Sequence, residues 1–409
     1  CRSLGTRNFK SFGALLCTLS AMSRRGAVQR SPTFFVGAEK QKKDLDAFQR
    51  REQQLAEVYY KNKPLCFNAC TYQRTHPVKA NSGHRDADAT LVSPMAVGVA
   101  DGVSQIEEYG IDSSELPTEL LRQCEELAFD QLLPRSRAIA PYHGPIPLVR
   151  EAFCGTECLG STTLVLALLD NSTRIHGKLH PMIAVISIGD CELVILRRLQ
   201  GRSGPLELVF HTEMQRVDGH CQTPLQLARV DDRIDAAFDD NITVEVIERG
   251  SAVHCISAYE SDIVIVGSDG VFDNLYLDEV AAIANKVLPP SGASRPTQSS
   301  LLTNLSKRIV EAAHQKTKPT VGGFLPEAPI GRGGKMDDTS CVVAEIIEWT
   351  EAHQKLYARE EVYPKWSNFW HCQVGCDGDE NELQEYDGEM TPPGFRKKGR
   401  RDEMFCSIS

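Results

Sequence analysis

The stretch DIVIVGSDGVFDN at residues 262–274 combines a short apolar run with an aspartate that follows it closely. The same pairing occurs in MAVGVADG at 95–102. It occurs in reverse order in GKMDDTSCVVAEI at 334–346, where the acids precede the apolar run. Short runs rich in Val and Ile predict buried β-strands. Each aspartate therefore stands at a strand end, where the sheet fixes its backbone while its side chain can reach solvent.

Carboxylates held at three strand ends can converge on one spot, and such oxygen ligands are what hard divalent cations require. The competing interpretation is that each Asp-Gly pair marks a hairpin turn, since both residues tolerate turn geometry. One motif alone leaves the two interpretations balanced. The three motifs together favour a metal site that contains Asp101, Asp269 and Asp337.

The spacing of apolar runs predicts an α+β fold. Strands of 4 to 8 residues separated by tight turns suit antiparallel pairing, and helical patterns come in blocks. The expected strands are 65–70, 95–100, 162–169, 182–188, 192–196, 206–210, 243–247, 263–267 and 341–347. The expected helices are 44–60, 117–133, 277–288 and 301–314.

Composition narrows the function classes. The chain has 409 residues and a formal net charge of −10, and this charge argues against general nucleic-acid binding, which needs a basic face. Fourteen cysteines are scattered without a disulfide framework or a convincing zinc pattern, so we expect reduced thiols. The sequence contains no run of 18 or more apolar residues, so it predicts no membrane-spanning helix.

In order and in neighbouring residues, the motifs resemble the metal-dependent protein phosphatases of type 2C (the PPM family), and most of all their compact, often mitochondrial branch. The matching stretches are VADGVSQI from Val99, GSTTLVLALL from Gly160, SIGDCELVIL from Ser187, GSDGVFDN from Gly267 and GGKMDDTS from Gly333. HTEMQ at His211 and TPLQL at Thr223 add a segment typical of that branch. The resemblance covers roughly residues 65–348.

This resemblance implies a four-layer α-β-β-α sandwich, with two antiparallel sheets flanked by helix pairs. It also implies hydrolysis of phosphoserine and phosphothreonine in proteins by a water molecule that two Mn²⁺ or Mg²⁺ ions activate, with a weaker third ion. Asp101 would bridge both ions, the Gly102 carbonyl would bind one of them, and Asp269 and Asp337 would supply further carboxylates. Asp190 would bind the third ion; the competing interpretation is that Asp190 is simply an aspartate in a surface turn.

Around the site, the resemblance leaves several side chains with open roles. Asp86 in GHRDADATLV aligns with the aspartate of the acidic entry motif, so the resemblance implies that it binds a metal ion, directly or through water. Arg85 replaces the acid that usually precedes it. Arg85 could clamp the substrate phosphate through its bidentate fork, with Lys79 and His84 as rival candidates. Asp338 is expected to support the ligands, and Asp273 to support the edge at Asp190. The Gly- and Pro-rich segment 319–334 is expected to form a rim or lid, or else an inert surface insertion.

The two ends of the chain suggest two different cellular locations. Residues 1–36 are basic and contain no acid, which is typical of a mitochondrial transit peptide or of a disordered basic arm. The last four residues, Cys406 to Ser409, fit a farnesylation signal, and the basic run RKKGRR precedes them. We expect a cytoplasmic protein that contacts membranes through this C terminus, with a mitochondrial location as the alternative.

The resulting domain prediction has three parts: a basic arm and helix at 1–60, a catalytic domain at 61–350, and an acidic, then polybasic tail at 351–409. The expected partners are phosphorylated proteins, with no nucleic acid, and the expected state is a monomer. Two alternatives to a protein phosphatase stay open. One is a catalytically weak or dead phosphatase-like scaffold, and the other is a different two-metal hydrolase.

Overall fold

The structure is a computed structural model that describes residues 63–81, 85–134, 140–175, 177–199, 204–217, 223–288, 290 and 296–360. Its contacts divide the chain into two units, 1–374 and 375–409, and the second unit lies outside the described residues. The transit-like segment, the expected helix 44–60, His84 and the Cys406 signal also lie outside them, so each stays a prediction. In the described part of the chain, no helix is both long and apolar enough for a bilayer.

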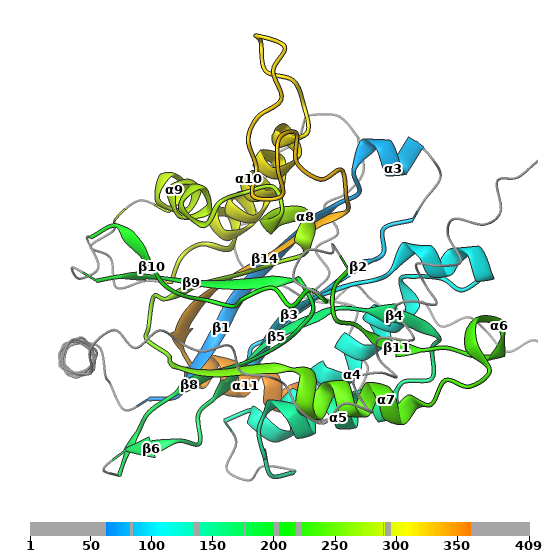
Figure 1. Cartoon of the computed structure of the whole chain (residues 1–409). Helices are drawn as coiled ribbons and strands as arrows, with labels where there is room; N and C mark the ends of the chain where they lie inside the picture. Colours follow the sequence, from blue (N-terminus) through cyan, green and yellow to red (C-terminus); the bar gives the residue numbers. More distant parts are fainter. Residues whose placement is uncertain are drawn as a thin grey trace, which may run out of the picture. The chain divides into compact units, whose positions relative to one another are not determined.

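Two five-stranded antiparallel sheets form the centre of the first unit (Figure 1). The first sheet has the order β1-β14-β13-β9-β10, with β1 Leu65–Arg74, β14 Thr339–Glu348, β13 Ile263–Gly267, β9 Glu192–Arg198 and β10 Leu206–His211. The second has the order β12-β8-β5-β3-β2, with β12 Ala252–Ser257, β8 Met182–Ile188, β5 Leu164–Asp170, β3 Ala96–Asp101 and β2 Asp88–Val92. Smaller pairs join β4 Gly160–Thr162 to β11 Leu227–Arg229, and β6 Arg174–Ile175 to β7 Lys178–Leu179.

Three apolar cores hold these layers together. The middle core lies between the sheets, where Val97, Val165, Leu193, Val264 and Val342 are fully buried. Because successive side chains of a strand point to opposite faces, the neighbouring positions serve the two outer cores. Apolar burial is the main favourable term in folding, so this shared burial fixes the sheets face to face.

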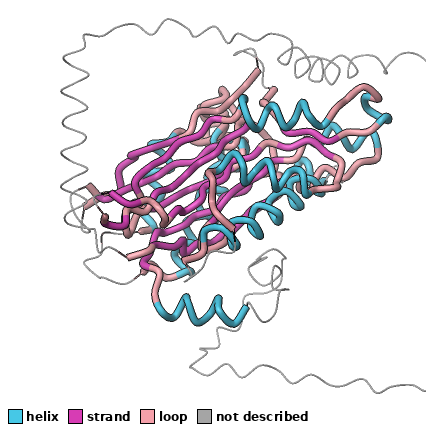
Figure 2. The backbone as a smooth tube through the Cα atoms, turned by 90° about the horizontal axis from the view of Figure 1, so that it is seen from below, coloured by secondary structure: helices cyan, strands magenta, loops and turns pink. Residues whose placement is uncertain are grey.

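Helices cover both outer faces of the sheet pair (Figure 1), and Figure 2, seen from below, shows helices crossing in front of the strands. On the first sheet lie α9 Leu277–Val287 and α10 Ser299–Lys316; α10 buries Leu302, Leu305 and Ile309 at helical spacing. On the second lie α4 Glu115–Leu132 and α5 Pro145–Gly155, whose buried side chains include Leu120 and Phe153. The predicted four-layer α-β-β-α sandwich is thereby confirmed.

The remaining elements are short or peripheral. They are α3 Pro77–Asn81, η1 Ser104–Tyr109, α6 Asp232–Asp235, α7 Asp240–Glu245, η2 Val246–Gly250, α8 Asp269–Phe272 and α11 Glu351–Glu360.

One expected strand is wrong. Residues 243–247 belong to α7 and to the π-helical turn η2 instead, although Thr, Val and Ile favour strands by propensity. The Asp239 carboxylate accepts a hydrogen bond from the Asn241 N–H, which caps α7, and Val246 and Ile247 pack into the core beneath the second sheet. The strand of this region is β12, which follows the turn.

Candidate metal centre

The end of β3 is fixed by backbone contacts from both sides. Thr162 donates its hydroxyl to the Asp101 carbonyl at 3.0 Å, and the Thr163 N–H donates to the same oxygen at 2.9 Å. The Gly102 N–H donates to the Ala87 carbonyl at 3.1 Å. A Cβ on Gly102 would lie 2.1 Å from the Ser113 carbonyl oxygen, so the backbone can pass here only as glycine. The backbone that carries the Asp101 side chain is therefore held rigidly.

A second aspartate, which the sequence interpretation missed, faces Asp101. The register of β2 and β3 pairs Asp88 directly with Asp101, so both side chains leave the same face of the sheet. Both carboxylate oxygens of Asp88 are buried, and no described group is within ordinary hydrogen-bond distance of them, although the Ser340 and Ser268 hydroxyls favour the charged form. Asp86, the predicted residue, lies two positions earlier, and its carboxylate accepts a hydrogen bond from the Asp88 N–H at 3.1 Å. Asp88 is therefore a stronger ligand candidate than Asp86.

Asp269 and Asp337 come from the neighbouring strands β13 and β14. Asp269 begins α8 just after β13, and Asp337 lies just before β14. The Ser268 N–H donates to the Ser340 carbonyl at 3.1 Å, which joins the two motifs. A Cβ on Gly270 would lie 2.0 Å from the Asp338 carbonyl oxygen, so the two backbone segments can approach this closely only because residue 270 is glycine. Antiparallel pairing thus brings the two carboxylates to one edge of the sheet.

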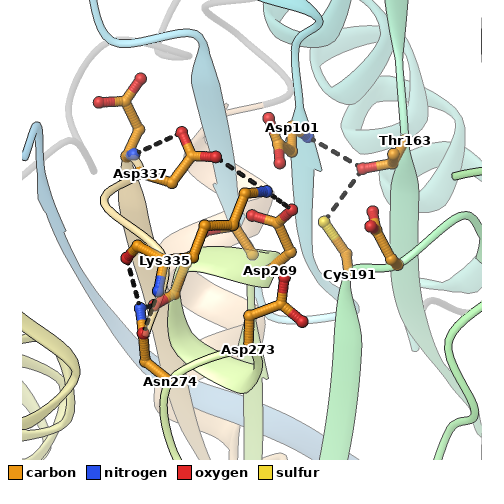
Figure 3. Close-up of polar contacts among 12 residues, drawn as sticks. Asp101, Thr163, Cys191, Asp269, Asp273, Asn274, Lys335 and Asp337 are labelled. Carbon is orange, nitrogen blue, oxygen red and sulfur yellow. Dashed lines mark hydrogen bonds and ion pairs between the residues drawn. The ribbon is translucent and has the colours of Figure 1, made fainter. Parts of the chain in front are cut away.

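Two lysines pair with this half of the cluster. Lys335 reaches between Asp269 and Asp337 and forms ion pairs with both, the one to Asp337 at 2.8 Å (Figure 3). Lys79 pairs with Asp337 and, at 3.0 Å, with Asp338. The other carboxylate oxygen of Asp338 is buried without a partner. Asp338 therefore holds Lys79 beside the cluster.

The pKa values follow burial and crowding. Burial, with Asp88 and Asp269 nearby, raises the pKa of Asp101 well above its ordinary value, and burial and Asp86 do the same for Asp88. Burial raises the pKa of Asp269 to about 7 and that of Asp86 to about 6. Burial alone would also raise the pKa of Asp337, but Lys335 and Lys79 outweigh it and lower that pKa. The raised pKa values show that the nearby positive charge is too small to balance the negative charge of Asp86, Asp88, Asp101 and Asp269.

At Asp190 the structure shows an arginine that the sequence did not indicate. Arg216 donates to Asp190 at 3.2 Å and to both oxygens of Asp273 at 2.7 and 2.9 Å. The second oxygen of Asp190 is buried and unpartnered. Asp273 thus supports the edge at Asp190 through Arg216. The third ion at Asp190 stays a prediction.

Arg85 lies away from the carboxylates. Its guanidinium pairs with Asp112 at 2.8 Å, and its side chain is 78% exposed. Of the three candidates for holding phosphate, Lys79 contacts the cluster, Arg85 does not, and His84 lies outside the described residues.

The segment 319–334 leads directly into the cluster. Its tip exposes Val321 and Phe324, while the Ile330 N–H donates to the Asp273 carbonyl at 3.1 Å near its base. Beyond Gly334 the chain continues into Lys335. The segment thus borders the carboxylate site, as a rim would.

The donor set suits a hard divalent cation. Within the described ranges, no three His, Cys, Asp or Glu side chains already surround a common point as ligands of one ion. The buried oxygens of Asp88, Asp190, Asp269 and Asp338 that lack partners nevertheless require a positive charge or donors. Carboxylate oxygens with a backbone carbonyl nearby are the ligands that Mg²⁺ and Mn²⁺ take.

Comparison with known proteins gives a consistent result, although no family model matches the chain. The chain is 26% identical over 280 residues to the probable protein phosphatase 2C 26 of Arabidopsis thaliana, covering 66% of this chain and 81% of that one. It is 25% identical over 287 residues to the probable protein phosphatase 2C 55 of Arabidopsis thaliana, covering 69% of this chain and 52% of that one. The match therefore spans most of the first relative and about half of the second.

Solved structures with a similar outline include the photosystem II phosphatase PBCP, at 23% identity and a TM-score of 0.49 over 68% of this chain and 98% of that one. Another is the catalytic domain of the serine/threonine phosphatase PstP in complex with two manganese ions, at 15% identity and a TM-score of 0.41 over 69% of this chain and 100% of that one. Membership of the compact, often mitochondrial branch stays a prediction. With its aspartate motifs at the ends of β3, β13 and β14 and its similarity to these plant proteins, the chain is a homologue of the type 2C protein phosphatases, the PPM family.

Proposed function

We propose that the chain hydrolyses phosphoserine and phosphothreonine in proteins, with two Mn²⁺ or Mg²⁺ ions as cofactors and water as the nucleophile. The observation that carries this proposal is the pair Asp88 and Asp101, which face each other across β2 and β3 with the Asp88 oxygens buried and unpartnered. An arrangement that costs this much desolvation is maintained where function requires it.

The ions would be held by Asp88, Asp101 and the Gly102 carbonyl on one side, and by Asp269 and Asp337 on the other. Asp86 and Asp338 would orient these ligands. When bound, such ions supply Lewis acids that neutralise phosphoryl charge and make water more acidic. The chain's own part is to fix the carboxylates rigidly, through the hydrogen bonds of Thr162 and Thr163 and the close approach at Gly270.

A cysteine nucleophile does not fit this site. Cys191 lies beside Thr163, with its sulfur 3.1 Å from the hydroxyl (Figure 3). Burial, followed by the charge of Asp101, raises the pKa of the Cys191 thiol well above its ordinary value, so it stays protonated. Because the thiolate is the reactive form, this buried, acidic environment disfavours Cys191 as the nucleophile.

Lys79 is the side chain that we propose to meet the substrate phosphate. It lies beside Asp337 and Asp338, and its side chain is 22% exposed, so the ammonium is within reach of solvent. An ammonium at this place adds positive charge next to a phosphoryl group held at the cluster. Arg85 would need to leave Asp112 to do the same.

One set of assays separates this proposal from its alternatives. Purified protein is incubated with a phosphothreonine peptide, with p-nitrophenyl phosphate and with bis(p-nitrophenyl) phosphate, in EDTA and in Mn²⁺. Manganese-dependent release of phosphate from the peptide supports the proposal. Cleavage of the diester alone would indicate another two-metal hydrolase, and no cleavage despite Mn²⁺ binding would indicate a scaffold.

A further inference from the structure

Lys335 is held in place by a backbone clamp. Its N–H donates to the side-chain oxygen of Asn274 at 2.7 Å, and the side-chain amide of Asn274 donates back to the Lys335 carbonyl at 2.9 Å. The same amide donates to the Gly270 carbonyl at 2.8 Å, which ties the clamp to α8. Gly334 precedes the lysine at φ +59°, and a Cβ there would lie 2.0 Å from the Asn274 oxygen. These contacts therefore fix the position of the Lys335 backbone.

The side chain of Lys335 lies between two carboxylates of the candidate metal centre. The Lys335 ammonium pairs with Asp269 and Asp337 (Figure 3). The Lys335 side chain is 30% exposed, so solvent can reach it. A single ammonium thus provides the positive charge that two proposed ligands of a divalent ion require. An ion at Asp269 and Asp337 has to compete with it.

In the part of the chain that the structure describes, the other half of the cluster, Asp88 and Asp101, has no such ion pair with a Lys, Arg or His. The Lys335 charge acts on Asp101 without pairing with it, and the uncharged hydroxyls of Ser340 and Ser268 favour the charged form of Asp88. Burial and mutual repulsion leave this pair with a strong requirement for a cation. A divalent ion that binds here breaks no ion pair of the described residues.

We propose that Lys335 is an internal counter-ion which makes the protein bind divalent cations in two steps of unequal affinity. This inference rests on the proposed function, because it assigns an order to the same two ions. The first ion binds at Asp88 and Asp101. The second binds at Asp269 and Asp337 only when the Lys335 ammonium withdraws, and the carboxylates exchange one cation for another without any covalent step.

The direct test is calorimetric titration of the metal-free protein with MnCl₂, without substrate. The wild type is expected to show two binding events of different affinity. Lys335→Met removes the competing charge, and losing a charge-assisted pair of this kind is expected to tighten the weaker event about tenfold to a hundredfold. Lys63→Met is the matched control, because Lys63 pairs with Glu348 at the other end of β14, and it should leave both events unchanged.

Lysine reactivity gives a second readout that needs no variant. Reductive methylation followed by peptide mass spectrometry should label Lys335 weakly in EDTA and several-fold more at saturating Mn²⁺, because the ammonium then leaves its ion pairs. If Lys335→Met does not fold, Lys335→Gln removes the charge but keeps a donor and serves in the titration.

The outcomes separate this inference from the proposed function. If the wild type binds no Mn²⁺, both fail. If it binds two ions with equal affinity, or if neither Lys335 variant tightens the weaker event, the counter-ion role is refuted while the phosphatase proposal stands. Labelling of Lys335 that is equal in EDTA and in Mn²⁺ would also refute it.

Discussion

Arg216→Met should destabilise the metal-free protein strongly, because Arg216 is the cation that pairs with both Asp190 and Asp273. These two aspartates are 1% and 2% exposed, so the variant would leave two buried carboxylates without the arginine that pairs with both, and only the more general attraction of Lys335 would still act on Asp190. Removing one partner of a buried ion pair costs about 3–5 kcal/mol. For a large domain this corresponds to a fall in Tm of at least roughly 6 °C.

The assay is thermal unfolding in EDTA at pH 7.5, followed by circular dichroism. Arg216→Met should lose stability, and the double variant Arg216→Met, Asp273→Asn should regain part of it, because one of the stranded charges is gone. Arg249→Met is the matched control, since Arg249 pairs with Glu245 on an exposed helix face and such pairs contribute about 0.3–0.5 kcal/mol. A Tm of Arg216→Met within about 1 °C of the wild type would refute the reasoning.

Three further predictions concern the surroundings of the metal centre. Burial lowers the pKa of His314 to about 4, against an ordinary 6.5, so the folded protein loses about 3 kcal/mol of stability as the pH falls from 6.5 towards 4. His314→Gln should therefore make the denaturation midpoint less dependent on pH over this range. A pH dependence equal to that of the wild type would contradict this prediction. Gly102→Ala should weaken Mn²⁺ binding at least about tenfold in calorimetry, because its Cβ would collide with the Ser113 carbonyl, and unaltered affinity would show that the backbone there is not part of the site. Asp88→Asn should raise the Tm of the metal-free protein yet weaken Mn²⁺ binding more than Asp86→Asn does, and the reverse ranking would return Asp86 to the ligand set.

Much of the fold could be predicted because apolar runs of strand length mark buried strands directly. Most expected strands were placed within a few residues, and the helix expected at 301–314 is α10 at Ser299–Lys316. The error at 243–247 arose because strand propensity there is overruled by the Asp239 cap and by packing of Val246 and Ile247. The cap is a local signal, but the packing of Val246 and Ile247 is a tertiary contact that leaves no local trace in the sequence.

The candidate site was predictable in part. Asp101, Asp269 and Asp337 carry a signal because each stands beside an apolar run. Asp88 also carried a signal, which the sequence interpretation did not use. A hairpin centred on the turn at Pro94 and Met95 pairs residue 88 with residue 101 by symmetry. Arg216 had no comparable signal, because its role depends on a loop contact between segments far apart in the sequence.

The central claim is that Asp101 is indispensable for metal-dependent hydrolysis, and phosphate release from a phosphothreonine peptide tests it most directly. The measurement compares the wild type with Asp101→Asn over a range of Mn²⁺ up to saturation, with Lys63→Met as a folded control. The account predicts that the wild type is active in Mn²⁺ and inactive in EDTA, and that Asp101→Asn loses about two orders of magnitude or more in turnover. Near-normal turnover of Asp101→Asn at saturating Mn²⁺, or wild-type hydrolysis that persists in EDTA, would contradict it.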